Sequence, residues 1–447
     1  MRVHENTNKN TNLHMVYMQR KYSAEAKVGE KVLVAGWVAK VRDLGGLKFF
    51  LLRDRLGVIQ VTAKKGSVPD KIFNKVGGLG REDAVSVTGK VMAAKQAPGG
   101  MEIVPDKIDV VAKAEPNLPI DISGKIESGK DKRFDYRWMD VRDPKMQAIF
   151  RVKSAAMKYI RDYFENQGFV EIQTPVIQAA GAEGGATMFP VVYYQKEAFL
   201  RQSPQLYKQM MMASGMDRVY EIGQAFRAEK FHTSRHVSEF MSVDFEQAWI
   251  ETEEDIMCTL ENMVVHSLKG IVKDCGRELE ILNARIKIPT LPIRRFTYEE
   301  VVGILNKAGI KMGWGDDMED AAEKKLGEIL DKKGVEWYFI TKFPSKIKPF
   351  YVMLDGKVSR GLDLDFRGME MASGGQREHR YEVLKGVMKQ KGLDPHKFDF
   401  YLDAFRYGMP PHGGIGFGVE RMVEKILGLP DIKEAILFPR TPDRLVP

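Results

Sequence analysis

The sequence predicts an α+β protein made of a small β-barrel followed by a larger domain in which helices and strands alternate. Short β-like runs recur roughly every ten residues over 31–112, which is the spacing of a small barrel. A segment rich in Pro, Gly, Ser and Lys follows at 115–132 and indicates a linker. After Pro144, helix-like and strand-like segments alternate to the C-terminus, which favours a mixed α+β domain.

Composition excludes several classes of protein. The chain has 447 residues, 44% hydrophobic and 29% charged, the balance of a globular protein with two or three domains. The net charge of +8 is compatible with a polyanionic partner. Two cysteines, Cys258 and Cys275, without a Cys/His cluster argue against a disulfide framework and a zinc site. No apolar run is long enough for a membrane span, so we expect no membrane association.

The first residues are rich in Asn, Thr and Lys and lack the hydrophobic core of a signal peptide. We expect residues 1–16 to form a disordered extension and the protein to be cytoplasmic. The β-like runs lie at 31–41, 47–53, 58–63, 84–93, 101–104 and 108–111. Five or six short strands separated by Gly, Asp and Pro predict a closed barrel over 17–114, and an OB-fold is the common barrel of this length. A generic β-sandwich is the alternative.

Residues 115–143 are predicted to be a hinge or linker, because they show little apolar periodicity. A helix is predicted next, ending at Gly168, since apolar residues recur at helical spacing. These residues are Ile149, Val152, Ala156, Tyr159, Ile160 and Tyr163.

Three segments of the larger domain carry candidate chemistry. In GFVEIQTPVI (168–177) a strand runs into Pro175, which alone indicates only an edge proline. The second segment is QSPQLYKQ (202–209) followed by FRAEKFHTSRHVSEF (226–240). Its cations lie around a turn between two strand-like runs, 218–226 and 239–247, and could clamp a polyphosphate or form a solvated basic loop. These cations are Arg227, Lys230, Arg235 and His236.

The third segment begins at LDLDFRGMEMASGGQREHR (362–380), where Asp363 and Glu370 could present carboxylates to Mg²⁺. It continues in YGMPPHGGIGFGVERM (407–422), where glycines lead into a helix bearing Arg421. Those glycines allow a ligand to approach the backbone closely. A dinucleotide fold is disfavoured, because Arg421 stands where its third glycine is required.

Together the three segments resemble motifs 1, 2 and 3 of the class II aminoacyl-tRNA synthetases. Pro175 corresponds to the proline of motif 1, FRAE to motif 2 and GFGVER to motif 3. From about residue 17 to 447 the chain resembles the archaeal- and eukaryotic-type aspartyl-tRNA synthetases, including AEGGATMFP, SGGQREHR and ILFPR. The resemblance implies a catalytic domain over 144–447 with an antiparallel sheet, a homodimer through motif 1, and ligation of aspartate to tRNA-Asp with ATP and Mg²⁺.

The resemblance also implies roles at the ATP site. Arg227 would hold the α-phosphate and the reacting carboxylate, whereas Arg421 would hold the γ-phosphate and cover one face of adenine. Phe240 would cover the other face. The remaining ATP residues implied are Glu229, Arg235, His236, Val237, Glu370, Gly418, Val419 and Glu420, and the implied Mg²⁺ ligands are Asp363, Glu370 and Ser373.

Aspartate brings a second carboxylate, which is costly to bury unless cations meet it. By resemblance, Lys208 and Arg377 supply those cations. The other aspartate residues implied are Glu183, Gln205, Arg227, Asp244 and Ser373. Asparaginyl-tRNA synthetases lack a lysine after the QLY sequence, so Lys208 favours aspartate.

In the barrel, the resemblance implies that anticodon bases are read by Arg42, Phe49, Gln60 and Glu102. Neighbouring strand residues point to opposite faces, so either Phe49 or Phe50 must face outward. Members that charge only tRNA-Asp carry Trp after GWV and Lys in the loop before the last strands, whereas members that also charge tRNA-Asn tend to carry His and Pro. Here these residues are Ala39 and Pro98. Neither the Trp nor the Lys is present, which favours charging of both tRNAs, although Ala39 also differs from the His of the members that charge both.

Three other functions are compatible with parts of the pattern. An asparaginyl-tRNA synthetase, or a relative that makes asparagine without tRNA, is the main rival, although the latter typically lacks a barrel. A lysyl-type enzyme would need carboxylates where Lys208 and Arg377 stand. A non-catalytic RNA-binding paralogue would usually have lost motif residues that this chain retains.

Overall fold

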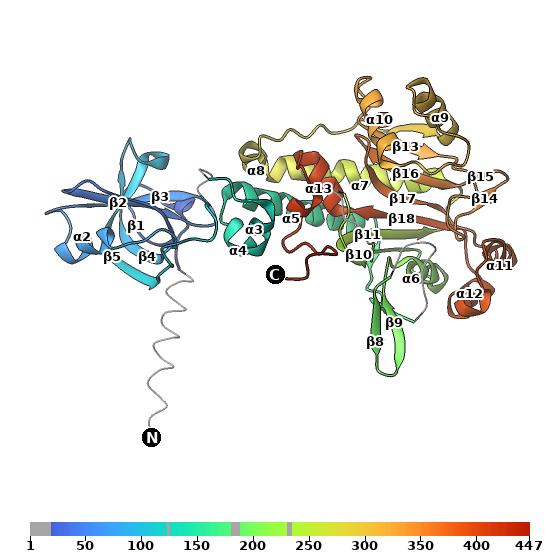
Figure 1. The fold of residues 1–447 in the computed structure, drawn as a ribbon, viewed down its shortest axis with the longest axis horizontal. Helices are drawn as coiled ribbons and strands as arrows, with labels where there is room; N and C mark the ends of the chain where they lie inside the picture. Colours follow the sequence, from blue (N-terminus) through green and yellow to red (C-terminus); the bar gives the residue numbers. More distant parts are fainter. Residues whose placement is uncertain (1–18, 123–125, 180–187, 230–234) are drawn as a thin grey trace. The chain divides into compact units, whose positions relative to one another are not determined.

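The computed structural model describes residues 19–122, 126–179, 188–229 and 235–447. The predicted extension 1–16 and the candidates Glu183 and Lys230 therefore lie outside the described residues. The chain divides into two compact units, Met1–Gly129 and Lys130–Pro447, which are coloured blue to cyan and teal to red in Figure 1. Among the described residues, no helix is long and apolar enough to cross a membrane.

The smaller unit contains the predicted closed barrel, with strand order β1-β2-β3-β5-β4. Its strands are β1 Lys31–Asp43, β2 Leu47–Arg53, β3 Val58–Lys64, β4 Ala84–Ala93 and β5 Met101–Ala112. Alternate residues of β1, including Val32, Val34 and Val38, enter the barrel core. An unpredicted helix, α2 (Asp70–Gly77), connects β3 to β4 and packs on that core through Ile72 and Phe73. Short 3-10 turns lie at Ser23–Glu25 and Pro98–Gly100.

The two runs predicted at 101–104 and 108–111 form one continuous strand, β5. The sequence suggested a break at Pro105, which cannot donate a backbone hydrogen bond to a neighbouring strand. In the structure Pro105 faces Gly89, where the register of β4 against β5 shifts. A side chain on Gly89 would collide with the backbone of Val104 and Pro105. The bulge therefore accommodates the proline without ending the strand.

The linker predicted over 115–143 is shorter at its C-terminal end. Helices α3 (Lys130–Asp135) and α4 (Arg137–Asp140) belong to the larger unit. Arg133 forms ion pairs with Asp140 and Glu434, at 2.9 and 3.0 Å. Arg137 is fully buried and donates to Asp140 and Glu434. Charged residues thus attach this segment to the domain, and apolar periodicity could not reveal such an attachment.

The larger unit is built on an eight-stranded sheet, predominantly antiparallel as the resemblance implied, with β12–β13 and β6–β10 parallel. In spatial order the strands are β12 Arg294–Thr297, β13 Trp337–Thr341, β16 Gly361–Phe366, β17 Glu370–Gln376, β18 His412–Gly418, β11 Glu239–Ala248, β10 Arg218–Phe226 and β6 Val170–Glu171. This combination of a barrel and a helix-flanked sheet confirms the predicted α+β class.

Two long helices and two short ones cover one face of the sheet. They are α5 Pro144–Asn166, α7 Glu253–Asp274, α8 Gly276–Ile281 and α13 Val419–Leu427. The helix predicted before Gly168 is α5, which begins after Asp143, whose side chain accepts from the amide of Lys145. Helix α7 contacts β16, β17 and β18, and α13 contacts β11 (Figure 1). The largest hydrophobic core lies between these helices and the sheet.

Smaller helices border the rest of the sheet. Helices α6 Gln205–Met210, α11 Tyr381–Gln390 and α12 Asp399–Arg406 share a second core. Helices α9 Tyr298–Lys307 and α10 Asp320–Asp331 pack near β12 and β13 around a third. The strand pair β14 Leu354–Asp355 and β15 Val358–Ser359 forms a small ribbon.

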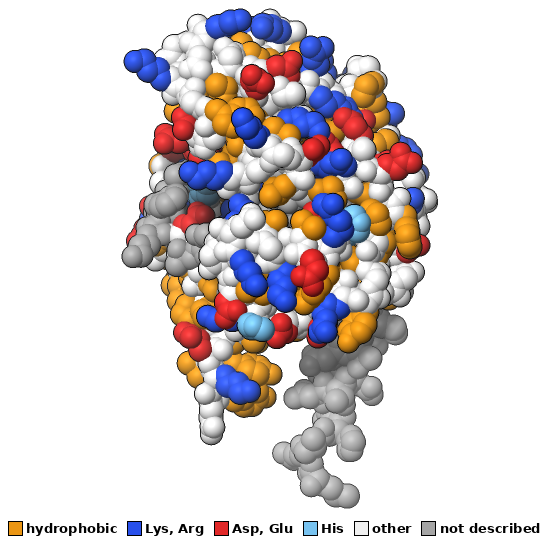
Figure 2. Space-filling model, turned by 90° about the vertical axis from the view of Figure 1, so that its right-hand side faces the viewer, with side chains coloured by type: hydrophobic (Ala, Val, Ile, Leu, Met, Phe, Trp, Pro, Cys, Tyr) orange, Lys and Arg blue, Asp and Glu red, His pale blue; other side chains and the backbone are white. Residues whose placement is uncertain are grey.

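A three-stranded sheet projects from the larger unit. It contains β7 Ile177–Gln178, β8 Pro190–Tyr193 and β9 Lys196–Leu200. Val192 and Tyr194 near the β8–β9 turn are 91% and 85% exposed. The hairpin projects at the bottom of the larger unit, where hydrophobic side chains gather in Figure 2. Exposed apolar groups of this kind mark a surface suited to a protein contact.

Candidate active site

A cavity of about 250 Å³ opens on the sheet face opposite α7. Strand alternation explains which residues reach it: Val243 and Ile415 enter the helix-side core, whereas Asp244 and Gly416 line the cavity. The glycines of β18 are needed here, because a side chain on Gly414 would collide with Phe245 and Glu246. The predicted glycine-rich segment therefore forms part of the cavity floor.

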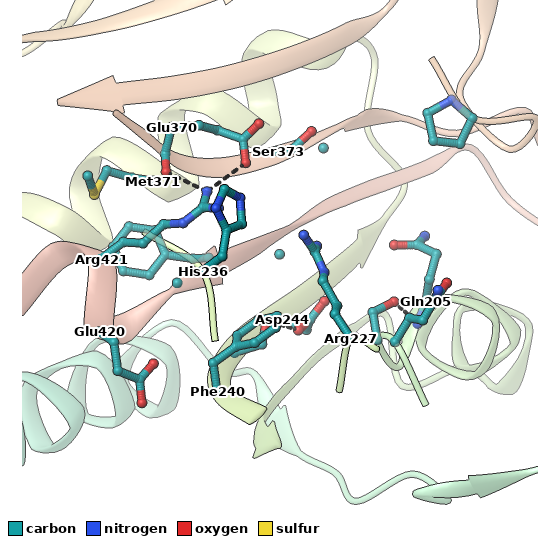
Figure 3. Close-up of a pocket in the computed structure, with 18 of the residues that line it drawn as sticks. Gln205, Arg227, His236, Phe240, Asp244, Glu370, Met371, Ser373, Glu420 and Arg421 are labelled. Atoms are coloured by element: carbon teal, nitrogen blue, oxygen red, sulfur yellow. Dashed lines mark hydrogen bonds and ion pairs between the residues drawn. The ribbon is translucent and has the colours of Figure 1, made fainter. Parts of the chain in front are cut away.

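The predicted hairpin of motif 2 is formed by β10 and β11, with register pairs running from Arg218–Gln247 to Phe226–Glu239. Arg227 follows β10, and its guanidinium lies 5.3 Å from the ring centre of Phe240. Its buried Nε has no hydrogen-bond partner among the described residues. Figure 3 shows Arg227 extending into the cavity beside Asp244 and Phe240. A buried donor without a partner in a polar cavity is suited to an anionic group.

Arg421 reaches the other end of the cavity from the first turns of α13. Its Nη1 donates to the backbone oxygen of Glu370 at 2.9 Å and to Glu370 Oε1 at 3.2 Å (Figure 3). His236 lies beside Arg421 (Figure 3), and burial lowers its pKa, so the imidazole is neutral at pH 7. This end therefore offers a cation, a neutral donor and a carboxylate within one site.

Nearly all the described ATP candidates line this cavity, and one does not. The lining residues are Arg227, Glu229, Arg235, His236, Val237, Phe240, Glu370, Gly418, Glu420 and Arg421. Val419 is fully buried in the helix-side core, so it can contribute only through its backbone. Helix α13 begins at Val419. The sequence alone did not show that the side chain of this residue turns away from the cavity, whereas those of its neighbours reach it.

The candidates for the amino-acid end also lie together. Gln205, Asp244, Ser373 and Arg377 line the cavity. Lys208 lies behind this lining, 1% exposed, and its ammonium donates to Asp244 at 2.9 Å and to the Ile415 carbonyl at 2.7 Å. Lys208, which the resemblance assigns to the substrate carboxylate, is thus already paired with a protein carboxylate.

Arg377 is paired in the same way, by a residue that the sequence did not single out. Its Nε and Nη2 donate to Glu246 at 2.9 and 3.3 Å, and Nη2 also reaches Gln205 at 3.3 Å. Burial opposes ionisation of Glu246, but Arg377 and Lys208 outweigh it and lower its pKa. Ser242, Asp244 and Glu246 alternate along β11, and this period-2 polar pattern was a signal for Glu246.

The candidate Mg²⁺ ligands divide into two groups. Glu370 and Ser373 line the cavity, whereas both oxygens of Asp363 accept from Lys348 at 2.7 Å. Burial, with repulsion from Glu370, raises the pKa of Asp363. The described residues contain no cluster of three or more His, Cys, Asp or Glu suited to a metal. Carboxylate and hydroxyl oxygens beside a phosphate site nevertheless fit Mg²⁺, which keeps several waters and needs few protein ligands.

The barrel candidates share one face. Strand register pairs Arg42 with Phe49, and Gln60 with Glu102, and Gln60 Nε2 donates to Glu102 at 2.9 Å. Phe49 is half-buried, whereas Phe50 is fully buried in the barrel core, so Phe49 is the outward residue of the pair. The alternation therefore predicted one outward phenylalanine, and the structure identifies it.

The two positions implicated in tRNA choice lie elsewhere in the barrel. Ala39 occupies a bulge in β1, where the register against β2 shifts between Val38 and Lys40. Pro98 begins the exposed turn Pro98–Gly100 before β5.

Comparison with known proteins gives two family matches. Residues 129–442 match the family described as tRNA synthetases class II (D, K and N), and residues 32–111 match the OB-fold nucleic acid binding domain. The chain is 48% identical to an aspartate–tRNA(Asp) ligase of Thermococcus kodakarensis, over 94% of this chain and 97% of that protein. It is 47% identical to an aspartate–tRNA(Asp/Asn) ligase of Methanopyrus kandleri, over 94% and 96%.

A solved structure also resembles the whole chain. It is the asparaginyl-tRNA synthetase of Pyrococcus horikoshii complexed with asparaginyl-adenylate, with a TM-score of 0.90 and 34% identity. The alignment covers 96% of this chain and 100% of that one. The predicted barrel type and catalytic-domain type are confirmed, whereas the likeness in fold extends to both aspartate and asparagine enzymes.

Proposed function

Because the chain belongs to the class II tRNA synthetases of the D, K and N group, we propose that it is an aspartate–tRNA ligase. It activates L-aspartate with ATP, releases pyrophosphate and transfers the aspartyl group to tRNA. The carrying observation is the pair of buried cations, Lys208 and Arg377, joined through Glu246 beside the cavity that Arg227 enters. The Thermococcus and Methanopyrus ligases, which act on aspartate, support the same assignment.

The paired cations are held in fixed positions before a second carboxylate binds. Each cation is neutralised before the substrate arrives, Lys208 by Asp244 and Arg377 by Glu246. The aspartate side chain then enters a site whose charges are already held by fixed partners, and Asp244 faces the substrate ammonium. Preorganised charge of this kind strengthens binding because little rearrangement is required.

Activation requires positioning rather than a protein nucleophile. The substrate α-carboxylate attacks the α-phosphorus in line, and pyrophosphate leaves. Arg227 holds both reacting groups, and its Nε, which has no hydrogen-bond partner among the described residues, supports that role. Arg421 holds the γ-phosphate end, while Phe240 lies against the purine. The neutral His236 donates a hydrogen bond without adding charge.

Mg²⁺ supplies charge neutralisation on the polyphosphate when it is bound. Glu370 and Ser373 would hold it, since both line the cavity. Asp363 can join them only if Lys348 releases its carboxylate. Until then Asp363 keeps the Lys348 ammonium at the cavity wall.

The barrel face that carries Arg42, Phe49, Gln60 and Glu102 binds the anticodon of tRNA-Asp, and of tRNA-Asn as well. Single-stranded bases stack on aromatic side chains and are read by polar groups along their edges. The net charge of +8 supports a polyanionic partner. We place the enzyme in the cytoplasm, where translation consumes aminoacyl-tRNA.

The active enzyme is a homodimer through the segment around Pro175. Apolar side chains on both sides of this proline support the interface, since Val170 and Ile177 are 45% and 47% exposed. The exposed hairpin β8–β9 pairs with β7 and extends the same apolar surface. The dimer would bury these groups.

The deciding experiment is ATP–pyrophosphate exchange without tRNA, with aspartate, asparagine and lysine supplied separately. We expect exchange to depend on aspartate. Exchange supported by asparagine alone would make the chain an asparaginyl-tRNA synthetase, a class whose fold it also resembles. Absence of exchange with every amino acid would favour the non-catalytic RNA-binding alternative.

A further inference from the structure

Helix α10 lies against the turn that connects β16 to β17, at the polyphosphate end of the cavity. The contact is backbone to backbone: a side chain on Gly327 would collide with Gly368, and one on Gly368 would collide with the backbone of Glu323. Gly368 also has φ +69°, a left-handed conformation that favours glycine. Two residues after this turn comes Glu370, the residue that Arg421 contacts.

Arg235 is held at this junction by two separate groups. Its Nη1 donates to Glu323 Oε2 on α10 at 2.9 Å, and its Nη2 donates to the Gly368 carbonyl at 2.9 Å. The side chains of Arg235 and Glu323 are 6% and 17% exposed, so the pair is largely shielded from water. Asp320 is 3.6 Å from the same Nη1 but is 49% exposed, which makes it the weaker partner.

We propose that Glu323 is a positioning residue for Arg235 and thereby sets the affinity of the cavity for the polyphosphate of ATP. This inference rests on the ATP-binding part of the proposed function. A long side chain such as arginine loses conformational freedom when it binds a phosphate. Contacts at both Nη1 and Nη2 fix the guanidinium plane before ATP arrives, because a guanidinium donates in a rigid fork.

The charges around Glu323 are consistent with this role. Glu370 and Asp320 repel its carboxylate, whereas Arg235 and Arg421 attract it. Burial, followed by repulsion from Glu370, raises the pKa of Glu323 to about 7. Glu323 therefore depends on a cation to stay ionised in a site already rich in carboxylates, and Arg235 is in direct contact with it.

The test measures Mg-ATP binding by calorimetry and exchange kinetics in Glu323→Gln, Arg235→Ala and the double variant. The matched control is Glu328→Gln, on the same helix, whose side chain is 63% exposed and 3.5 Å from Lys325. We expect Glu323→Gln to weaken ATP binding about tenfold, the effect of losing one charge-assisted hydrogen bond. The KM for aspartate should stay within about twofold, and the control should bind ATP like the wild type.

The double variant separates positioning from a general structural effect. If Glu323 acts through Arg235, Glu323→Gln should add less than about twofold to the loss in Arg235→Ala. A full additional loss in that background would overturn the inference, as would unchanged or tighter ATP binding in Glu323→Gln. If Glu323→Gln does not fold, Glu323→Asp, which retracts the charge, should weaken ATP binding, and wild-type affinity there would contradict the proposal. Calorimetry of ATP binding needs no amino acid. If the protein binds ATP but shows no aspartate-dependent exchange, the result contradicts aspartate as the substrate and leaves the role of Glu323 in ATP binding unaffected.

Discussion

The cavity of the larger unit and the outer face of the barrel both carry charged and polar candidates, but they hold them differently. In the cavity, Lys208, Arg377 and Glu246 are at most 1% exposed and joined in one network. On the barrel face Arg42 is exposed and Phe49 half-buried. Buried charges interact in a low effective dielectric, whereas exposed ones are screened by water and salt. Substitutions should therefore cost far more in the cavity than on the barrel.

The largest effect should follow removal of the carboxylate at the polyphosphate end. We expect Glu370→Ala to lower kcat/KM for exchange about a thousandfold, because both the proposed Mg²⁺ ligand and a partner of Arg421 are lost. Asp363→Ala should lower kcat/KM for exchange less, since the Asp363 carboxylate is already paired with Lys348. Exchange assays over a range of Mg²⁺ check both. Glu382→Ala, an exposed change on α11, is the control, and Glu370→Ala with wild-type turnover would break the metal assignment.

Lys208→Ala tests the amino-acid end. Truncating one member of a buried pair leaves Asp244 without its cation, at a cost of about 3–5 kcal/mol. We expect the KM for aspartate to rise at least about a hundredfold, with a smaller change in the KM for ATP. A KM for aspartate close to that of the wild type would remove Lys208 from the pocket.

Part of that loss is structural, because Lys208 is paired even without substrate. Lys208→Met combined with Asp244→Asn removes both charges, so thermal unfolding should recover relative to Lys208→Met alone. Aspartate binding should not recover, since the site then lacks its cation. Recovery of both would mean that the pair serves folding rather than substrate binding.

Phe49→Ala extends the comparison to the barrel. Loss of one stacking aromatic costs about 1–3 kcal/mol, so kcat/KM for aminoacylation of tRNA-Asp should fall between about 5-fold and about 160-fold. Exchange without tRNA should be unchanged, because the barrel takes no part in activation. Val111→Ala, at the far end of β5 and 57% exposed, is the matched control. Equal losses in exchange and aminoacylation would indicate damage to the fold instead.

The fold was predictable where periodicity is strong and short-range. The strands 47–53 and 84–93 and helix α5 match their predicted positions, because alternating or helical apolar spacing reports burial directly. The continuity of β5 was not predictable, since it depends on Gly89 opposite Pro105. The attachment of α3 and α4 depends on pairing of Arg133 with Glu434, far away in sequence.

The candidate site shows the same limit. Motif residues such as Arg227 and Arg421 follow a sequence pattern and reach one cavity. Their charged neighbours are only partly visible in the sequence: Glu246 lies on the motif 2 hairpin and follows its period-2 pattern, whereas Lys348 and Glu323 come from segments without a motif. Sequence patterns therefore indicate which groups meet the substrate, whereas partners such as Lys348 and Glu323 emerge only from tertiary contacts.

The smallest expected effect concerns tRNA choice. Relatives at 48% and 47% identity carry the Asp and the Asp/Asn specificity, so overall similarity does not decide between them. Discrimination requires a steric or polar conflict with the wrong first anticodon base. Ala39, in its bulge, and Pro98, in an exposed turn, provide neither a large aromatic nor a cation.

We therefore expect purified tRNA-Asp and tRNA-Asn transcripts to be charged with kcat/KM values less than about a hundredfold apart, near 2.7 kcal/mol. Ala39→Trp with Pro98→Lys should widen the ratio by lowering kcat/KM for tRNA-Asn, because the added groups introduce the missing conflict. Exchange without tRNA should not change, since neither residue belongs to the cavity. A wild-type preference for tRNA-Asp above about a hundredfold would show that the enzyme discriminates. In that case residues other than Ala39 and Pro98 must reject the wrong base, and the rest of the barrel face is where they should be sought.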